Sequence, residues 1–170
     1  MSQEEFNKIF LHELSDLYSA EEQIVEELPN MIKAASNEEL KEVLKSHLQA
    51  SKMQIKRLEQ IFLLLDAKPS KKVCMGIKGI LKEGSNFISE FSKSNSRDAA
   101  LISAAQKVEH YEIASYGSAY SHADYLGCDR EIKNLLNDTL TEEKDANKKL
   151  SKLAEGSIFS AGINKLACKS

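Results

Sequence analysis

Two glutamates spaced three residues apart, Glu109 and Glu112, stand in the stretch QKVEHYEIASYG, with small and apolar residues on both sides. Residues three apart lie on one face of a helix, so the two carboxylates would point the same way. If that face lies inside the protein, burying two negative charges is unfavourable unless a cation shares the site. The pair is therefore a candidate for a carboxylate site that binds a metal ion.

Two more glutamates stand where an apolar residue would be expected. Glu21 continues the stripe of Leu14, Leu17, Ile24 and Leu28, and Glu143 continues that of Leu136, Leu140 and Leu150. Three helices would thus direct carboxylates inward, which is the arrangement of ferritin-like two-metal sites. Oxygen-rich ligand sets of this kind suit iron and manganese. The alternative is that SAEEQIVEE around Glu21 and TEEKDANKK around Glu143 are simply solvated acidic faces.

A fourth helix contributes no carboxylate at the corresponding level, where the sequence reads HLQASKMQ. His47 and Gln54 lie on or near its apolar stripe and are the candidate ligands there. A histidine at such a position is more often a hydrogen-bonded core residue than a ligand. Tyr18 and Tyr116 are candidate neighbours of the site, although packing is the simpler role for both.

Four long helices must position these residues. Apolar residues recur every three or four positions over residues 3–35, 36–66, 97–126 and 129–155. Ser36 and Glu39 have the capping-box pattern at the start of the second helix. Gly127 suits the left-handed residue that ends a helix, and Asp129 suits the N-cap of the next.

The connection over residues 67–96 is much longer than the roughly 2–8 residues usual between helices of a hairpin, and it carries one shorter helical stretch. The sequence therefore predicts an all-α, ferritin-like four-helix bundle, in which two helical hairpins are joined by a long crossover with an extra short helix. We expect a single domain over residues 1–155, followed by a tail at 156–170.

Composition excludes several classes of partner. The net charge is −3 and no basic block is present, which argues against nucleic acid. No apolar run approaches the roughly 20 residues of a membrane span. The start, MSQEEFNKIF, is unlike a signal peptide. The three cysteines, at 74, 128 and 168, are odd in number, far apart and form no C-x-x-C pair, so they indicate neither a disulfide framework nor a zinc knuckle. We expect a cytoplasmic protein.

Three segments closely resemble the YciF-like family of bacterial stress-response proteins: LSDLYSAEEQI (14–24), AASNEEL (34–40) and RDAALISAAQKVEHYEIASYG (97–117). TLTEEKDANKKL (139–150) resembles the family's last helix more loosely. The resemblance implies a rubrerythrin-like bundle, a cytoplasmic homodimer and induction under stress. The family's biochemical activity is poorly defined, so the resemblance does not name a reaction.

By the same resemblance, Glu21, Glu109, Glu112 and Glu143 match acidic positions of the family's metal site, and Gln54 matches a position often held by glutamine or histidine. Where relatives usually read HLEET, this chain reads HLQAS, so Gln49 and Ala50 replace two glutamates. The last helix often has aspartate where this chain has Asn147.

We therefore expect iron or manganese at a partly degenerate site, with redox chemistry towards oxygen or peroxide. The alternative is a metal-free, dimeric helical interaction module in which the site is vestigial. A homodimer is also suggested by apolar residues of the crossover that exceed the needs of one short helix: Val73, Ile77, Ile80, Phe87, Ile88 and Phe91.

Overall fold

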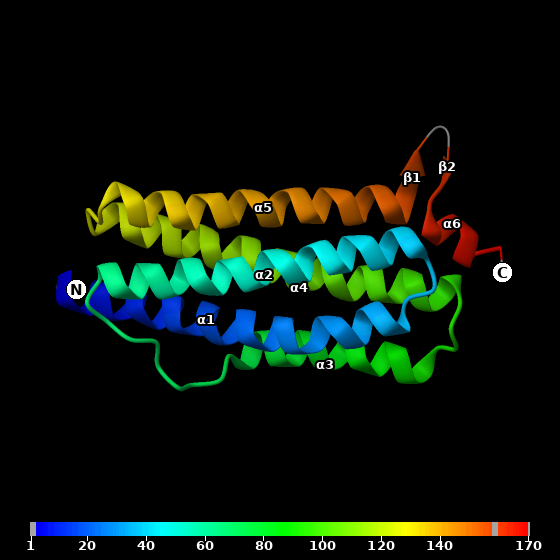
Figure 1. Cartoon of the computed structure of the whole chain (residues 1–170), viewed down its shortest axis with the longest axis horizontal. Coiled ribbons are helices and arrows are strands. Elements are labelled where there is room, and N and C mark those ends of the chain that lie inside the picture. Colours follow the sequence, from blue (N-terminus) through cyan, green and yellow to red (C-terminus); the bar gives the residue numbers. More distant parts are fainter. Residues whose placement is uncertain (1–2, 158–159, 170) are drawn as a thin grey trace.

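The protein is a bundle of four long helices with one helix packed outside it, as a computed structural model that describes residues 3–157 and 160–169 shows (Figure 1). The long helices are α1 (Gln3–Ala34), α2 (Glu38–Leu64), α4 (Asn95–Tyr125) and α5 (Arg130–Glu155). The shorter elements are α3 (Met75–Glu90), β1 (Gly156–Ser157), β2 (Ser160–Ala161) and α6 (Ile163–Ala167).

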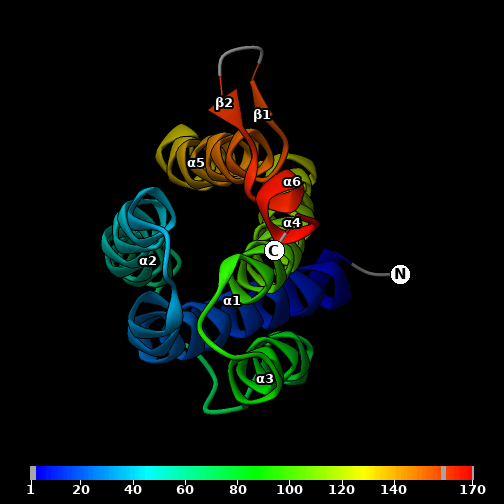
Figure 2. The same ribbon diagram turned by 90° about the vertical axis from the view of Figure 1, so that its right-hand side faces the viewer.

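The order of the long helices around the bundle is visible end-on in Figure 2. Helix α1 packs against α2 and α4, and α5 packs against the same two helices, so that α2 and α4 lie on a diagonal. Because α2 and α4 are not neighbours, the chain between them must cross the bundle, and α3 lies on this crossover. The predicted all-α, ferritin-like architecture with a long crossover is confirmed.

The turn between α1 and α2 differs from the expected capping box. Asn37, not Ser36, is the N-cap, and its side chain accepts a hydrogen bond from the backbone N–H of Leu40 at 2.9 Å. The backbone N–H groups of Ser36 and Asn37 instead donate to the carboxylate of Asp98 on α4, at 2.7 and 2.8 Å. The prediction was wrong by one residue because a distant carboxylate fixes this turn.

The other predicted helix boundaries fit more closely. Gly127 follows Leu126, the C-cap of α4, and has φ +67°, the left-handed conformation expected of it. Asp129 is the N-cap of α5, although its side chain makes no capping hydrogen bond.

The interior of the bundle has three levels along its length. The first core joins the C-terminal halves of α1 and α5 to the N-terminal halves of α2 and α4, and includes Leu28, Met31, Leu40, Leu44, Leu101, Ile102, Val108 and Leu150. The second core lies at the opposite end and includes Phe10, Leu14, Leu17, Leu58, Phe62, Ala119 and Leu136. Between them in the sequence of every long helix stand buried polar residues, here called the polar belt: Glu21, His47, Ser51, Gln54, Glu109, Glu112 and Glu143.

Helix α3 covers the seam between α1 and α4. Ile77 is fully buried there, and Ile80, Phe87 and Ile88 pack against the first core. Most of the apolar residues that suggested a partner are therefore satisfied within the chain, and only Val73 and Phe91 of that set are classed as exposed, at 53% and 41%. The homodimer stays a prediction.

The described residues of the tail, 156–157 and 160–169, lie at the end of the bundle (Figure 1). Strands β1 and β2 pair antiparallel, and Ile163 of α6 joins the first core. Among the described residues, no helix combines the length and the apolar character needed to cross a membrane.

Candidate metal centre

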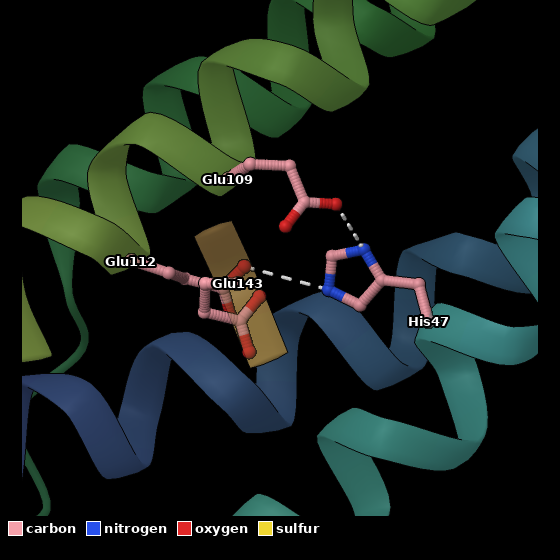
Figure 3. A group of neighbouring side chains, drawn as sticks. All are labelled: His47, Glu109, Glu112 and Glu143. Carbon is pink, nitrogen blue, oxygen red and sulfur yellow. Dashed lines mark ion pairs between the residues drawn. The ribbon is translucent and has the colours of Figure 1, made fainter. Parts of the chain in front are cut away.

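Four side chains from three helices meet in the polar belt (Figure 3): His47 from α2, Glu109 and Glu112 from α4, and Glu143 from α5. Each offers one ligand atom, and these atoms all lie within 4.8 Å of one another. None of the four side chains is more than 5% exposed. The three-residue spacing of Glu109 and Glu112 places both carboxylates on the inward face of α4, as predicted.

His47 lies between the two glutamates of α4. Its Nδ1 is 2.8 Å from Glu109 Oε1, and its Nε2 is 3.4 Å from Glu112 Oε2. Both contacts are at ion-pair distance, but their geometry is not that of a hydrogen bond. His47 Nε2 and all four carboxylate oxygens of Glu109 and Glu112 have no hydrogen-bond partner among the described residues. Burial lowers the pKa of His47, but the Glu109 and Glu112 carboxylates outweigh burial and hold this pKa well above its usual value.

The carboxylates raise one another's proton affinity. Burial, followed by the neighbouring charge of Glu143, raises the pKa of Glu112 to about 8. Burial raises the pKa of Glu143 to about 9, helped by Glu109 and opposed by His47. Without a metal ion, the belt therefore holds protons at neutral pH. A divalent cation at the same oxygens would displace them.

Glu21 lies beside this group of four. It is fully buried, and burial followed by the charge of Glu112 raises its pKa well above the usual value. The hydroxyl of Tyr116 donates to one oxygen of Glu21 at 2.7 Å, while the other oxygen has no partner. Tyr116 is thus a neighbour of the site, whereas the hydroxyl of Tyr18 donates to Glu59 at 3.3 Å.

Gln54 holds the glutamate of α5 in place. Its side-chain amide donates to Glu143 and, at 3.2 Å, to Glu142, while its own carbonyl oxygen is buried without a partner. Arg57 donates two hydrogen bonds to Glu142, at 2.6 and 2.7 Å. Sequence reasoning missed Arg57, although a basic residue three positions after Gln54 lies on the same face of α2 and was a usable signal.

The residues present fit a divalent metal ion such as iron or manganese. Carboxylates suit manganese, imidazole suits iron, and the unpartnered oxygens of Glu21, Glu109 and Glu112 are buried acceptors that lack a donor. Ala50 offers no ligand atom. Asn147 is only partly buried and accepts a hydrogen bond from Gln106 at 3.4 Å. All six predicted site residues lie in the polar belt, and whether they bind a metal ion stays a prediction.

Comparisons with known proteins bear on the family and the fold of the chain. Residues 5–162 match a family described as a domain of unknown function, DUF892. Protein YciF of Escherichia coli strain K12 is 39% identical over 169 residues, which are 97% of this chain and 99% of YciF.

Solved structures match along most of the chain as well. The E. coli stress protein YciF gives a TM-score of 0.83 at 42% identity, covering 87% of this chain and 93% of YciF. A protein named YcfI from Rhodopseudomonas palustris gives 0.84 at 43% identity, covering 91% and 96%. A protein from Xanthomonas campestris, at 18% identity and a TM-score of 0.67 over 87% of this chain and 89% of its own, shares the fold. The chain belongs to the DUF892 family, the family of YciF.

Proposed function

We propose that this chain is a bacterial stress-related protein that binds iron or manganese in the polar belt. The stress role rests on similarity to the E. coli stress protein YciF. The metal rests on one observation, the convergence of ligand atoms from His47, Glu109, Glu112 and Glu143 within 4.8 Å. Buried carboxylates at that separation repel one another, and a divalent cation would neutralise them.

The chain's own residues support such a site in two ways. Tyr116 donates to Glu21, and Gln54 donates to Glu143, so two carboxylates have their orientation fixed before a cation arrives. The two apolar cores close the belt at both ends and limit the access of water. A bound iron or manganese ion would supply redox chemistry towards oxygen or peroxide.

Metal analysis of protein purified without a chelator or nickel resin tests this proposal. We expect iron or manganese to co-purify, and added Fe²⁺ or Mn²⁺ to raise the melting temperature, since a ligand that binds only the folded state stabilises it. The variant Glu143→Ala should lose this rise. The control Glu131→Ala changes an exposed glutamate of the same helix and should keep it. An unchanged melting temperature of the native chain with both metals would refute the proposal.

A second candidate function is a metal-free, dimeric interaction module. The observation that favours it is His47, which lies close enough to Glu109 and Glu112 to neutralise part of the belt as an imidazolium. Protons shared among the remaining carboxylates would neutralise the other negative charges of the belt. This candidate predicts no metal-dependent change in melting temperature and a dimer mass by light scattering at micromolar concentration. A monomer mass together with metal-dependent stabilisation would exclude it.

A further inference from the structure

The two outer seams on opposite sides of the bundle are closed differently. Helix α3 packs over the seam between α1 and α4, whereas no helix among the described residues covers the seam between α2 and α5 (Figure 2). A groove of about 440 Å³ lies along this uncovered seam. Its lining includes His47, Ala50, Glu143 and Ala146.

This groove reaches the candidate metal centre. His47 and Glu143 belong both to its lining and to the group of four ligand residues. Ala50 on α2 and Ala146 on α5 contribute only methyl groups, so two small side chains on the two walls leave the space open. A second hollow of about 480 Å³ lies between α1 and α3, but none of its lining residues belongs to the polar belt.

The groove has more carboxylates than cations in its lining. Glu39, Glu42, Glu142 and Asp145 line it besides Glu143, against a single lysine, Lys149. Outside the lining, Arg57 of α2 pairs with Glu142 of α5. Lys45 pairs with Glu42 within α2, and Lys148 pairs with Asp145 within α5. The side chains of both lysine pairs are at least half exposed, so each lysine is held only weakly by its carboxylate. The surface of the groove therefore still attracts a small cation.

We propose that the groove between α2 and α5 is the route by which a divalent cation enters and leaves the polar belt. This inference rests on the metal binding proposed above and adds the path by which the ion reaches the site. The cation passes Ala50 and Ala146 and meets His47 and Glu143 first. The acidic lining favours cations over anionic ligands along the same path.

A leucine at position 50 should obstruct this route without removing a ligand. We would add Fe²⁺ anaerobically to the full chain, follow uptake, and then follow release into an excess of a chelator that forms a coloured ferrous complex. Ala50→Leu should slow both uptake and release by roughly tenfold, since passage then requires the helices to move, and the dissociation constant should stay unchanged. Ala146→Leu on the opposite wall should do the same.

The matched control is Gln49→Leu, which adds the same side chain at the neighbouring exposed position outside the groove lining. It should keep native rates. If both alanine variants also keep native rates, the route is wrong while the metal site stands. If the native chain takes up no Fe²⁺, the proposed function fails, and the route fails with it. Equal slowing in Gln49→Leu would also overturn the route.

Discussion

The apolar cores and the polar belt are built on the same four helices, yet they act on stability in opposite directions. In the cores, each helix buries leucine, isoleucine and phenylalanine side chains, and removing this surface from water is favourable. In the belt, the same helices bury Glu21, Glu109, Glu112 and Glu143 with His47 as the only basic side chain of the belt. The comparison teaches that the cores provide the stability that lets an unfavourable cluster of buried carboxyl groups persist between them.

The largest effect should come from the cores. Leu14 is fully buried in the second core, and Leu14→Ala should lower the free energy of unfolding by about 2–5 kcal/mol through lost apolar contact and a residual cavity. The loss should be the same with and without added metal, because Leu14 lies outside the belt. Urea unfolding measures it.

The matched control for this loss is Leu63→Ala in α2, where the leucine is 80% exposed. Its effect should stay within about 0.5 kcal/mol. A loss at Leu14 no larger than that at Leu63 would contradict the assignment of the second core.

The second effect comes from the belt and should have the opposite sign. Glu112→Gln keeps the shape of the side chain and removes a carboxyl group whose negative charge, present above its pKa of about 8, would face Glu143 and Glu21. His47 keeps its contact with Glu109 at 2.8 Å, so no isolated cation is left behind. We expect the metal-free protein at pH 9, where Glu112 is mostly ionised, to gain roughly 1–2 kcal/mol in its free energy of unfolding.

The same variant should respond less to metal ions. Fe²⁺ or Mn²⁺ should raise its melting temperature much less than that of the native chain, because the carboxylate of Glu112 is replaced by a neutral amide. Thermal unfolding with and without metal measures both changes. Destabilisation of the metal-free variant would show that the carboxylate of Glu112 stabilises the belt, contrary to the comparison of belt and cores.

The third effect is a dependence on pH. The pKa values of Glu112, about 8, and Glu143, about 9, are raised above their ordinary value of 4.5, so the folded chain binds more protons than the unfolded chain between these limits. The metal-free protein should therefore lose stability as the pH rises from about 5 towards 9. The pKa of His47 is also raised, so its contribution is lost in the same direction.

Metal affinity should change in the opposite sense and rise with pH, because protons and cations compete for the same oxygens. Urea unfolding at several pH values, together with metal titrations, tests both trends. Glu143→Gln should have a shallower loss of stability with rising pH than the native chain. Equal slopes would mean that Glu143 does not titrate in this range.

The cores and most of the belt could be predicted from the sequence because both depend on local periodicity. Each long helix repeats its apolar residues every three or four positions, and a glutamate that continues such a stripe is recognisable without a structure. Glu21, Glu109, Glu112 and Glu143 were found in this way. His47 was recognised as a candidate, but its place between two glutamates of another helix depends on how α2 and α4 face one another across the bundle.

Features that depend on residues far apart in the chain could not be predicted. Asp98 fixes the turn at Ser36 from a position 62 residues away, so the local capping pattern was misleading. The pair of Arg57 and Glu142 joins α2 to α5. Ala50 and Ala146 line the groove from α2 and α5, and neither alanine carries a signal by itself.

The smallest effect should follow from restoring a carboxylate to α2. Ala50 is three residues after His47, about one helical turn, and lines the same groove as His47 and Glu143. A glutamate at position 50 could therefore direct its carboxylate towards the candidate metal centre. We expect Ala50→Glu to bind Fe²⁺ or Mn²⁺ more tightly, by roughly tenfold or about 1.4 kcal/mol.

The same substitution should slightly destabilise the metal-free protein, because it adds a further negative charge to the belt. Ala50→Gln is the matched control, since it has the same length and no charge. Isothermal titration would give both affinities, and urea unfolding would give both stabilities. If Ala50→Gln tightens metal binding as much as Ala50→Glu, side-chain size rather than charge is responsible. If neither variant changes the affinity, position 50 lies outside the reach of the bound ion, and the missing carboxylate of α2 is not what weakens the site.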